Sequence, residues 1–343
     1  MMNNYYDPKY LRGAIQSIQP ARLFFRNNFF TESVRFPTKQ VTFEFAENAR
    51  GLLPYANDDV PAPAVSRTGY QAKTFTAPLI SGSRVISPAT LEMKLLGESP
   101  YNSGMSPDER ARQIAANDLM ELVDQLYRQE EYMCARVKQD GKLIIDGEGI
   151  HQEIDYGLPF METPTGANKW TASYDILGKL QKMARELRKR GTNPNQLIVG
   201  EGIAELFNQN QAILDLRRDD YFKIPDPGNL ADGIIYLCTL RAPGLHLDVY
   251  EYSEYYTDKA GDVVPVIDPG TVIMQSSRER NFLLHGAVTY IDERTREYIT
   301  EMTDYVPYVS VETNPPVKRL IVSSRVLPMP RDVNSWYVLK NAV

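Results

Sequence analysis

The clearest pattern of apolar and polar positions along the chain predicts one very long helix. Apolar residues recur at steps of three and four between Leu119 and Val137, and the run continues to about Lys138 without a Gly or Pro. The helix is expected to start at SPDE, with Ser106 as N-cap, Pro107 in the first helical position and Glu109 reaching back to the cap. A helix of roughly thirty residues is about 45–50 Å long, two to three times the usual length. We therefore expect it to span the molecule.

Shorter patterns predict strands and further helices. VTFEFAE, from Val41, alternates and predicts a strand with one dry face, while KLIIDGEGIHQEIDYG predicts a β-hairpin with Asp146 and Gly147 near its turn. From Ser173 the pattern becomes α/β, with helices expected over residues 174–189 and over GIAELFNQNQAIL. The expected strands are QLIV, GIIYLCTL, LHLDVYEYSEYY and GTVIMQSS, followed by YVPYVSVE and VKRLIVSSRVLPM near the end of the chain.

Two segments lack a clear period. Residues 48–105 carry Pro, Gly, Ser, Asp and Asn every few positions, so we expect an extended hairpin that projects from the body. Residues 1–35 are predicted to form an irregular arm with one short helix near residues 8–18. Seven phenylalanines lie between Ala21 and Glu47, and Phe24, Phe25, Phe29 and Phe30 are too closely spaced to share one face of a regular element. We therefore expect some of these four rings to be buried by another molecule.

Composition bounds the class of protein. The chain has 343 residues, a net charge of −6, 43% hydrophobic and 24% charged residues, which is ordinary for a globular protein of about two domains. The negative charge argues against tight binding of nucleic acid. Cys134 and Cys238 have no partner motif and are expected to be small buried residues. No signal peptide and no apolar stretch long enough to span a bilayer is recognisable.

Reactive constellations are scarce. His151, His246 and His285 lie at no metal-ligand spacing, and a structural role is favoured for all three. The Gly-Glu-Gly at residues 200–202 lacks a third glycine and a Gly-Lys-Ser/Thr sequence, so a plain strand-to-helix turn is favoured over a phosphate site. The basic run RELRKR lies at the end of a predicted helix, where complementation of the helix dipole explains it. The sequence therefore predicts no catalytic residue, no cofactor and no metal site, and favours a protein that is not an enzyme.

Several motifs together resemble a known family. LFFR at residues 23–26 and Phe36-x-Thr38-x-x-Val41 resemble the opening of lambda-type phage capsid proteins, the major capsid protein E family. The likeness continues in KLIIDGEGIHQEIDYG, in Trp170 followed by Tyr174-Asp175, in LDLRRDD, and in the closing NPPVKRLIVSSRVLPMPRDVNSWYVLKNAV. These stretches cover nearly the whole chain in collinear order.

The resemblance implies an α+β fold of the Hong Kong 97-type phage capsid class. It would comprise an N-terminal arm with a first strand (1–46) and an extended loop (47–105). A peripheral domain with the long spine helix and a hairpin (106–156) would follow, then an α/β axial domain (157–290) and return strands of the peripheral domain (291–343). The implied function is a structural major capsid protein that self-assembles into hexamers and pentamers of an icosahedral head around double-stranded DNA. The implied localisation is the virion, after assembly in the host bacterial cytoplasm.

The same resemblance implies subunit interfaces and partners. Phe24, Phe25, Phe29 and Phe30 of the arm, and Tyr70, Lys73 and Phe75 of the projecting loop, are expected to contact neighbouring copies. A separate scaffolding protein, a portal and a decoration protein are expected as partners, together with weak non-specific contact with DNA and no membrane. A separate scaffold is expected because the shell-like sequence begins within about twenty residues of Met1, too few for a fused scaffold domain. Little or no maturation cleavage is expected for the same reason.

Two other readings stay open from the residues alone. One is a different virion component, such as a tail-tube protein, which would lack the long helix. The other is an α/β enzyme whose site is assembled from dispersed residues. Lys73 lies where a relative forms covalent cross-links, but a solvated lysine is the favoured interpretation.

Overall fold

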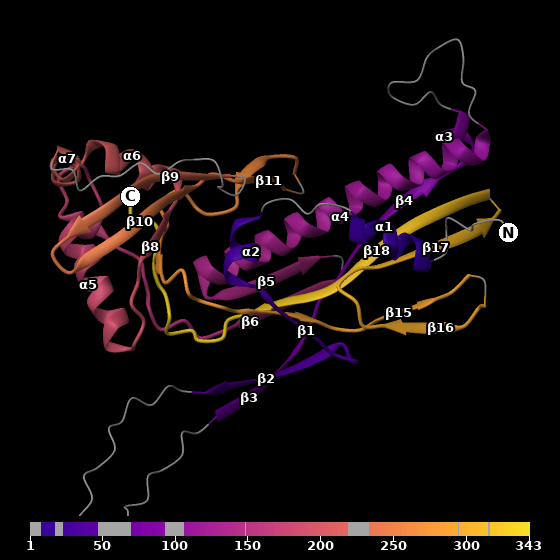
Figure 1. Cartoon of the computed structure of the whole chain (residues 1–343), viewed down its shortest axis with the longest axis horizontal. Helices are drawn as coiled ribbons and strands as arrows, with labels where there is room; N and C mark the ends of the chain where they lie inside the picture. The colour runs from indigo at the N-terminus through magenta and orange to yellow at the C-terminus, as the bar shows by residue number, and fades with distance from the viewer. Residues whose placement is uncertain are drawn as a thin grey trace, which may run out of the picture.

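The computed structural model describes residues 8–17, 23–46, 70–92, 106–147, 149–218, 233–258, 260–293, 295–314 and 316–343. These residues form a mixed α+β body that is elongated in Figure 1. A lobe of helices and strands occupies one end, on the left of the view, and a long helix, α4 (Pro107–Asp140), runs from beside this lobe towards the other end along a second sheet. A hairpin of two strands projects away from the body below.

Helix α4 confirms the predicted long helix and its start after Ser106, and it ends at Asp140, two residues beyond the predicted Lys138. The Ser106 side chain accepts a hydrogen bond from the Glu109 backbone, and the Glu109 carboxylate accepts one from the Ser106 backbone at 2.8 Å. The helix stops at Gly141, whose left-handed φ of 63° suits glycine and whose N–H donates to the Val137 carbonyl at 3.0 Å. With 34 residues it is about 50 Å long at 1.5 Å per residue.

The sheet beside α4 is built from strands far apart in the sequence. Its order is β1 (Glu32–Arg35), β14 (Phe282–His285), β18 (Pro316–Met329) and β17 (Val306–Thr313), and β4 (Leu79–Ile86) also pairs with β18. Only β1 and β14 pair in parallel. The predicted helix near residues 8–18 is confirmed as α1 (Pro8–Ser17), which contacts both β17 and α4.

The predicted extent of the projecting loop is wrong at its C-terminal side. Strand β4 pairs over eight residues with β18, and α3 (Pro88–Glu92) contacts α4, so residues 79–92 belong to the body. Glycine and serine in LISGSRVI indicated a loop, yet Gly82 has a packing reason. A Cβ at this position would lie 2.8 Å from Cδ2 of Leu122, so the glycine lets α4 approach the strand closely.

The lobe on the left of Figure 1 contains a six-stranded sheet. The order is β7 (Met161–Glu162), β19 (Tyr337–Leu339), β13 (Val272–Gln275), β8 (Gln196–Val199), β10 (Leu245–Tyr252) and β9 (Ile234–Ala242). The helices of the lobe are α5 (Ile176–Lys189), α6 (Glu201–Gln209) and α7 (Gln211–Arg218), preceded by a short 3-10 helix at Gly166–Asn168. The buried residues of these helices and those on one face of the sheet form a single apolar cluster.

The predicted helix over GIAELFNQNQAIL is two helices, because Asn210 separates α6 from α7. Its amide oxygen accepts from the Ile213 N–H at 3.3 Å, and its amide nitrogen donates to the carbonyls of Ala172 and Tyr174 at 3.0 and 2.9 Å. A side chain that binds its own backbone in this way interrupts a helix. The glycine pattern that follows β8 is a plain turn, as predicted: a Cβ at Gly200 would lie 2.5 Å from the Asp268 carbonyl.

Two predicted domain boundaries are corrected by the sheet pairings. Strand β14 lies within the predicted axial segment 157–290 but pairs with β1 and β18 beside α4. Conversely, β19 lies in the predicted return segment 291–343 but pairs with β13 and β7 in the lobe. The chain therefore crosses between the two sheets more often than the predicted boundaries allow.

Four antiparallel hairpins complete the described fold. They are β2 (Gln40–Ala46) with β3 (Tyr70–Thr76), β5 (Lys142–Gly147) with β6 (Ile150–Asp155), β11 (Tyr255–Thr257) with β12 (Val263–Pro265), and β15 (Val288–Ile291) with β16 (Tyr298–Glu301). The β5–β6 hairpin confirms the one predicted around Asp146 and Gly147. Cys134 and Cys238 are both free and buried, as expected.

Candidate assembly surfaces

The four arm phenylalanines are buried in their own chain, so the expectation that a neighbouring copy buries them is wrong. Phe24, Phe25, Phe29 and Phe30 are 6%, 0%, 1% and 1% exposed. A short helix, α2 (Phe24–Phe29), lets the rings converge: the centroids of Phe24 and Phe25 are 5.2 Å apart, and that of Phe25 lies 5.1 Å from Tyr252 of β10. The rings pack with Met133 and Val137 of α4 in the central apolar cluster.

A buried glutamate of α4 caps α2. Position Leu23 offers no side-chain acceptor, and the carboxylate of Glu131 takes its place. It accepts from the N–H groups of Phe24, Phe25 and Arg26 at 3.0, 2.8 and 2.9 Å. The Tyr252 hydroxyl adds a fourth bond at 3.0 Å. Burial raises the pKa of Glu131, while the backbone and hydroxyl donors oppose this by favouring the carboxylate.

A second buried glutamate, Glu130, holds the arm through Arg26. The Arg26 Nε lies 2.5 Å from Glu130 Oε2, and the Tyr305 hydroxyl of the loop before β17 donates to the same carboxylate at 2.9 Å. The guanidinium also lies over the Tyr127 ring at 4.9 Å. A buried charge left without its partner is strongly destabilising, so these bonds fix the arm to the subunit.

The other end of α4 carries a third buried charge. Lys138 is 0% exposed and pairs with Glu279, which also accepts from the Ser335 hydroxyl. Its Nζ lies 4.2 Å from the centre of the Trp336 ring, and the Trp336 indole N–H donates to the Lys138 carbonyl at 2.9 Å. This contact ties the loop before β14 and the C-terminal segment to the spine helix.

None of these buried carboxylates was singled out from the sequence. Glu130 and Glu131 lie on the side of the helix that carries Tyr127 and Cys134, between apolar positions. Two adjacent acidic residues within a predicted apolar stripe were the available signal, because a buried charge needs a partner elsewhere in the chain.

The projecting hairpin β2–β3 is joined to the body at its base. Val41 is fully buried, and the half-buried Phe75 packs against Tyr156 with ring centroids 6.2 Å apart. From there the two strands lead away from the body (Figure 1). Tyr70 and Lys73 lie in β3, but their side chains are outside the described part of the structure. The contacts expected for Tyr70, Lys73 and Phe75 with another copy therefore stay predictions.

A second hairpin presents an uncharged outer face. On β15–β16 the residues of one face, Val288 and Tyr290, are 3% and 5% exposed and pack against the body. The opposite face consists of Thr289, Ile291, Tyr298 and Thr300. Tyr298 is 79% exposed and lies directly across from Ile291, which is 47% exposed. The hydroxyls of the two threonines are 2.9 Å apart. Such a face is suited to contact with another protein surface.

Within the described residues, no group of three or more His, Cys, Asp and Glu side chains is placed to hold a metal ion. The same residues include no helix long and apolar enough to cross a membrane.

His285 is 2% exposed in β14, where burial lowers its pKa to about 4, and its Nε2 lies 3.8 Å from Asp304. The other two histidines, His151 and His246, are exposed.

Comparison with known proteins identifies the family. A family model described as phage major capsid protein E matches residues 7–341. A crystal structure assigned to a prophage capsid protein of E.coli CFT073 has a TM-score of 0.68 at 17% identity, with 96% of each chain covered. A phage-related protein from Bordetella bronchiseptica RB50 has a TM-score of 0.54 at 13% identity, covering 98% of this chain and 97% of that one. The capsid of cyanophage A-1(L) has a TM-score of 0.50 at 10% identity, with 92% of each covered.

No curated protein sequence matches the chain. The structural likenesses, all below 25% identity, show the fold, which is the mixed α+β fold of Hong Kong 97-type phage capsids. The family match spans nearly the whole chain and carries the function, a structural component of the virion shell. The chain belongs to the phage major capsid protein E family.

Proposed function

We propose that this protein is the shell subunit of an icosahedral phage head, assembling into hexamers and pentamers around packaged double-stranded DNA. The observation that carries the proposal is the family match over residues 7–341. Two features support it: the β2–β3 hairpin projects from the body (Figure 1), and the β15–β16 hairpin exposes an uncharged outer face.

The surface physics suits a shell. Removing apolar area from water contributes about 25 cal/mol per Å², so side chains such as Tyr298 and Ile291 give modest contacts that are repeated in every copy. Tyr70, Lys73 and Phe75 of β3 are proposed to contact a neighbouring subunit as well. The net charge of −6 favours only weak, non-specific contact with the enclosed DNA.

The partners follow from this role. We propose a separate scaffolding protein, a portal and a decoration protein, with assembly in the host bacterial cytoplasm before the protein enters the virion. No step of this function requires a cofactor or a catalytic residue.

Electron microscopy of the purified protein, alone and co-expressed with the products of neighbouring genes, tests the proposal. Rings of five or six subunits, or closed shells, are expected at micromolar concentration. A protein that stays monomeric in every one of these conditions would contradict the proposal.

A further inference from the structure

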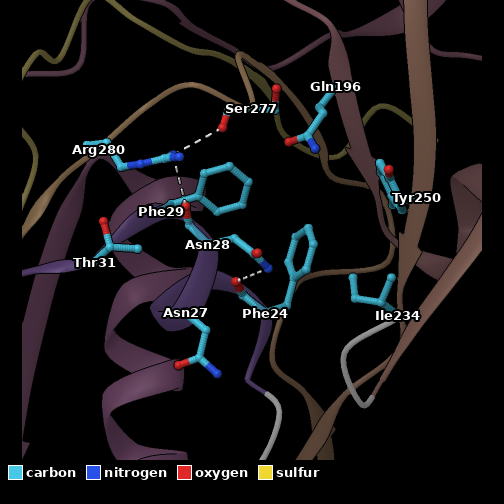
Figure 2. Close-up of a pocket in the computed structure, with 10 residues that line it drawn as sticks. All are labelled: Phe24, Asn27, Asn28, Phe29, Thr31, Gln196, Ile234, Tyr250, Ser277 and Arg280. Carbon is cyan, nitrogen blue, oxygen red and sulfur yellow. Dashed lines mark hydrogen bonds between the residues drawn. The ribbon is translucent and has the colours of Figure 1, made fainter. Parts of the chain in front are cut away.

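A polar pocket of about 290 Å³ lies between the arm and the axial lobe (Figure 2). Its residues come from three places. Phe24, Asn27, Asn28, Phe29 and Thr31 belong to the arm, Gln196, Ile234 and Tyr250 to strands β8, β9 and β10, and Ser277 and Arg280 to the loop before β14. This space is large enough for several water molecules or for a side chain.

We propose that this pocket receives a carboxylate side chain from a neighbouring copy of the chain. The inference rests on the proposed function, because it requires copies that pack side by side. Two observations carry it: the fixed orientation of Arg280 and the charge of the lining.

Arg280 is held in place by backbone groups. Its Nη1 lies 2.8, 3.2 and 3.4 Å from the carbonyl oxygens of Glu279, Ser277 and Asn28, as Figure 2 shows for the last two. The loop itself is bound to the arm, because the Asn281 N–H donates to the Phe29 carbonyl at 2.7 Å. The Nε and Nη2 groups of Arg280 have no partner in the described part of the chain, and this edge of a guanidinium matches both oxygens of a carboxylate.

Other arginines near the arm already have carboxylate partners. Arg26 pairs with Glu130, Arg35 with Asp304 at 2.8 Å, and Arg331 has Glu32 at 3.9 Å. Arg280 has no such partner among the described residues, and none of the ten residues that line the pocket is acidic. The lining therefore carries one positive charge and no negative charge.

One carboxylate lies close to the pocket lining: burial raises the pKa of the Tyr250 hydroxyl, and the charge of Asp248 raises it further. Asp248 of β10 is the register partner of Gln196 and accepts from the Thr239 hydroxyl at 2.6 Å. Its hydrogen-bond partner is on β9, and Asp248 itself does not line the pocket. The chain carries 44 acidic residues against 38 basic ones, so a neighbouring copy has carboxylates to supply.

Two arginine variants test the inference. Arg280→Gln is compared with Arg278→Gln, which removes the same charge two residues away. Both arginines are exposed in the free subunit, but only Arg280 lines the pocket. We expect Arg280→Gln to raise the protein concentration needed for particle formation about tenfold or more, the effect of losing a charged hydrogen bond. Arg278→Gln should assemble like the wild type. Equal assembly of the two variants, with wild-type particles still forming, would overturn the inference and leave the proposed function intact.

Chemical protection of the wild-type protein gives a second measurement that needs no variant. Arginines are modified with phenylglyoxal in free subunits and in particles, and peptides are mapped by mass spectrometry. Arg280 should react in free subunits and be protected in particles. Equal reaction of Arg280 in both states would overturn the inference even if Arg280→Gln unfolds. Protection of free subunits by added glutamate, without protection on assembly, would show a site for free carboxylates and would also overturn it. Wild-type protein that never assembles would remove both this inference and the proposed function.

Discussion

In the arm helix α2 and the outer hairpin β15–β16, the apolar content of the sequence and the exposure of the side chains disagree in opposite directions. The arm carries four closely spaced phenylalanines and resembles a segment that needs a neighbour, yet all four rings are buried in their own subunit. The hairpin has no such cluster of aromatic residues in its sequence, yet its Tyr298 is 79% exposed and lies across from Ile291. The arm stays on its own subunit because Glu131 and Glu130 of α4 bind its backbone N–H groups and its Arg26 side chain. Apolar density alone therefore does not locate an interface.

The largest expected effect on stability comes from the buried phenylalanines of the arm. Changing Phe25 and Phe30 together to Ala removes two fully buried rings, and each core Phe→Ala change typically destabilises by about 3–5 kcal/mol. We expect an insoluble subunit, or one that unfolds at much lower urea concentration. The control replaces the same residues with Leu, which fills more of the space and should lose less. A double alanine variant that unfolds like the wild type but fails to assemble would restore the arm as an interface.

Next in size is the cap on α2. Glu131→Ala leaves three backbone N–H groups and the Tyr252 hydroxyl without their acceptor, which we expect to destabilise the subunit by about 3–5 kcal/mol. Glu121→Ala, on an exposed position of the same helix, is the control and should change the unfolding free energy by less than about 0.5 kcal/mol. Equal urea midpoints for the two variants would show that Glu131 does not hold the arm.

A smaller effect is expected from pH at the strand that follows the arm. His285 pairs in β14 with Arg35 of β1, and burial lowers its folded pKa to about 4 from an unfolded value of about 6.5. Between these values the unfolded chain binds a proton that the folded chain does not, so stability falls as the pH drops from about 7 towards 4. The loss approaches about 3 kcal/mol.

His285→Gln isolates this contribution. Asp304, Arg35 and Arg26 surround the imidazole, and burial raises the pKa of Glu130, so other groups also titrate at acid pH. The difference in unfolding free energy between the wild type and the variant, measured from pH 7 to pH 5, should shrink as the pH falls. A difference that is constant over this range would contradict the assignment.

The smallest effect on stability is expected at the outer hairpin. Tyr298→Ala removes a ring that is 79% exposed, so the unfolding free energy should change by less than about 0.5 kcal/mol. Assembly should weaken markedly, because exposed aromatic residues are frequent anchors of protein interfaces. Thr295→Ala, at the hairpin turn, provides the control. Normal particle yield from the tyrosine variant would show that this face is not an interface.

The sequence predicts features that depend on near neighbours and misses those that depend on distant ones. Helix α4 and its N-cap, the β5–β6 hairpin and helix α5 follow from local periodicity and capping residues. The burial of the arm depends on Glu131, more than 100 residues away, and β4 on its pairing with β18. The corrected boundaries at β14 and β19 have the same cause, since a strand's sheet is chosen by its partner and not by its own pattern.

The central claim is that the arm belongs to its own subunit while the two hairpins contact neighbouring copies. A cryo-electron microscopy reconstruction of assembled particles, at a resolution that shows side chains, tests it directly. We predict Phe25 and Phe30 inside their own chain, the Glu131 carboxylate at the start of α2, and Tyr298 against another copy. An arm that lies across a neighbouring subunit, with Glu131 detached from it, would contradict the account.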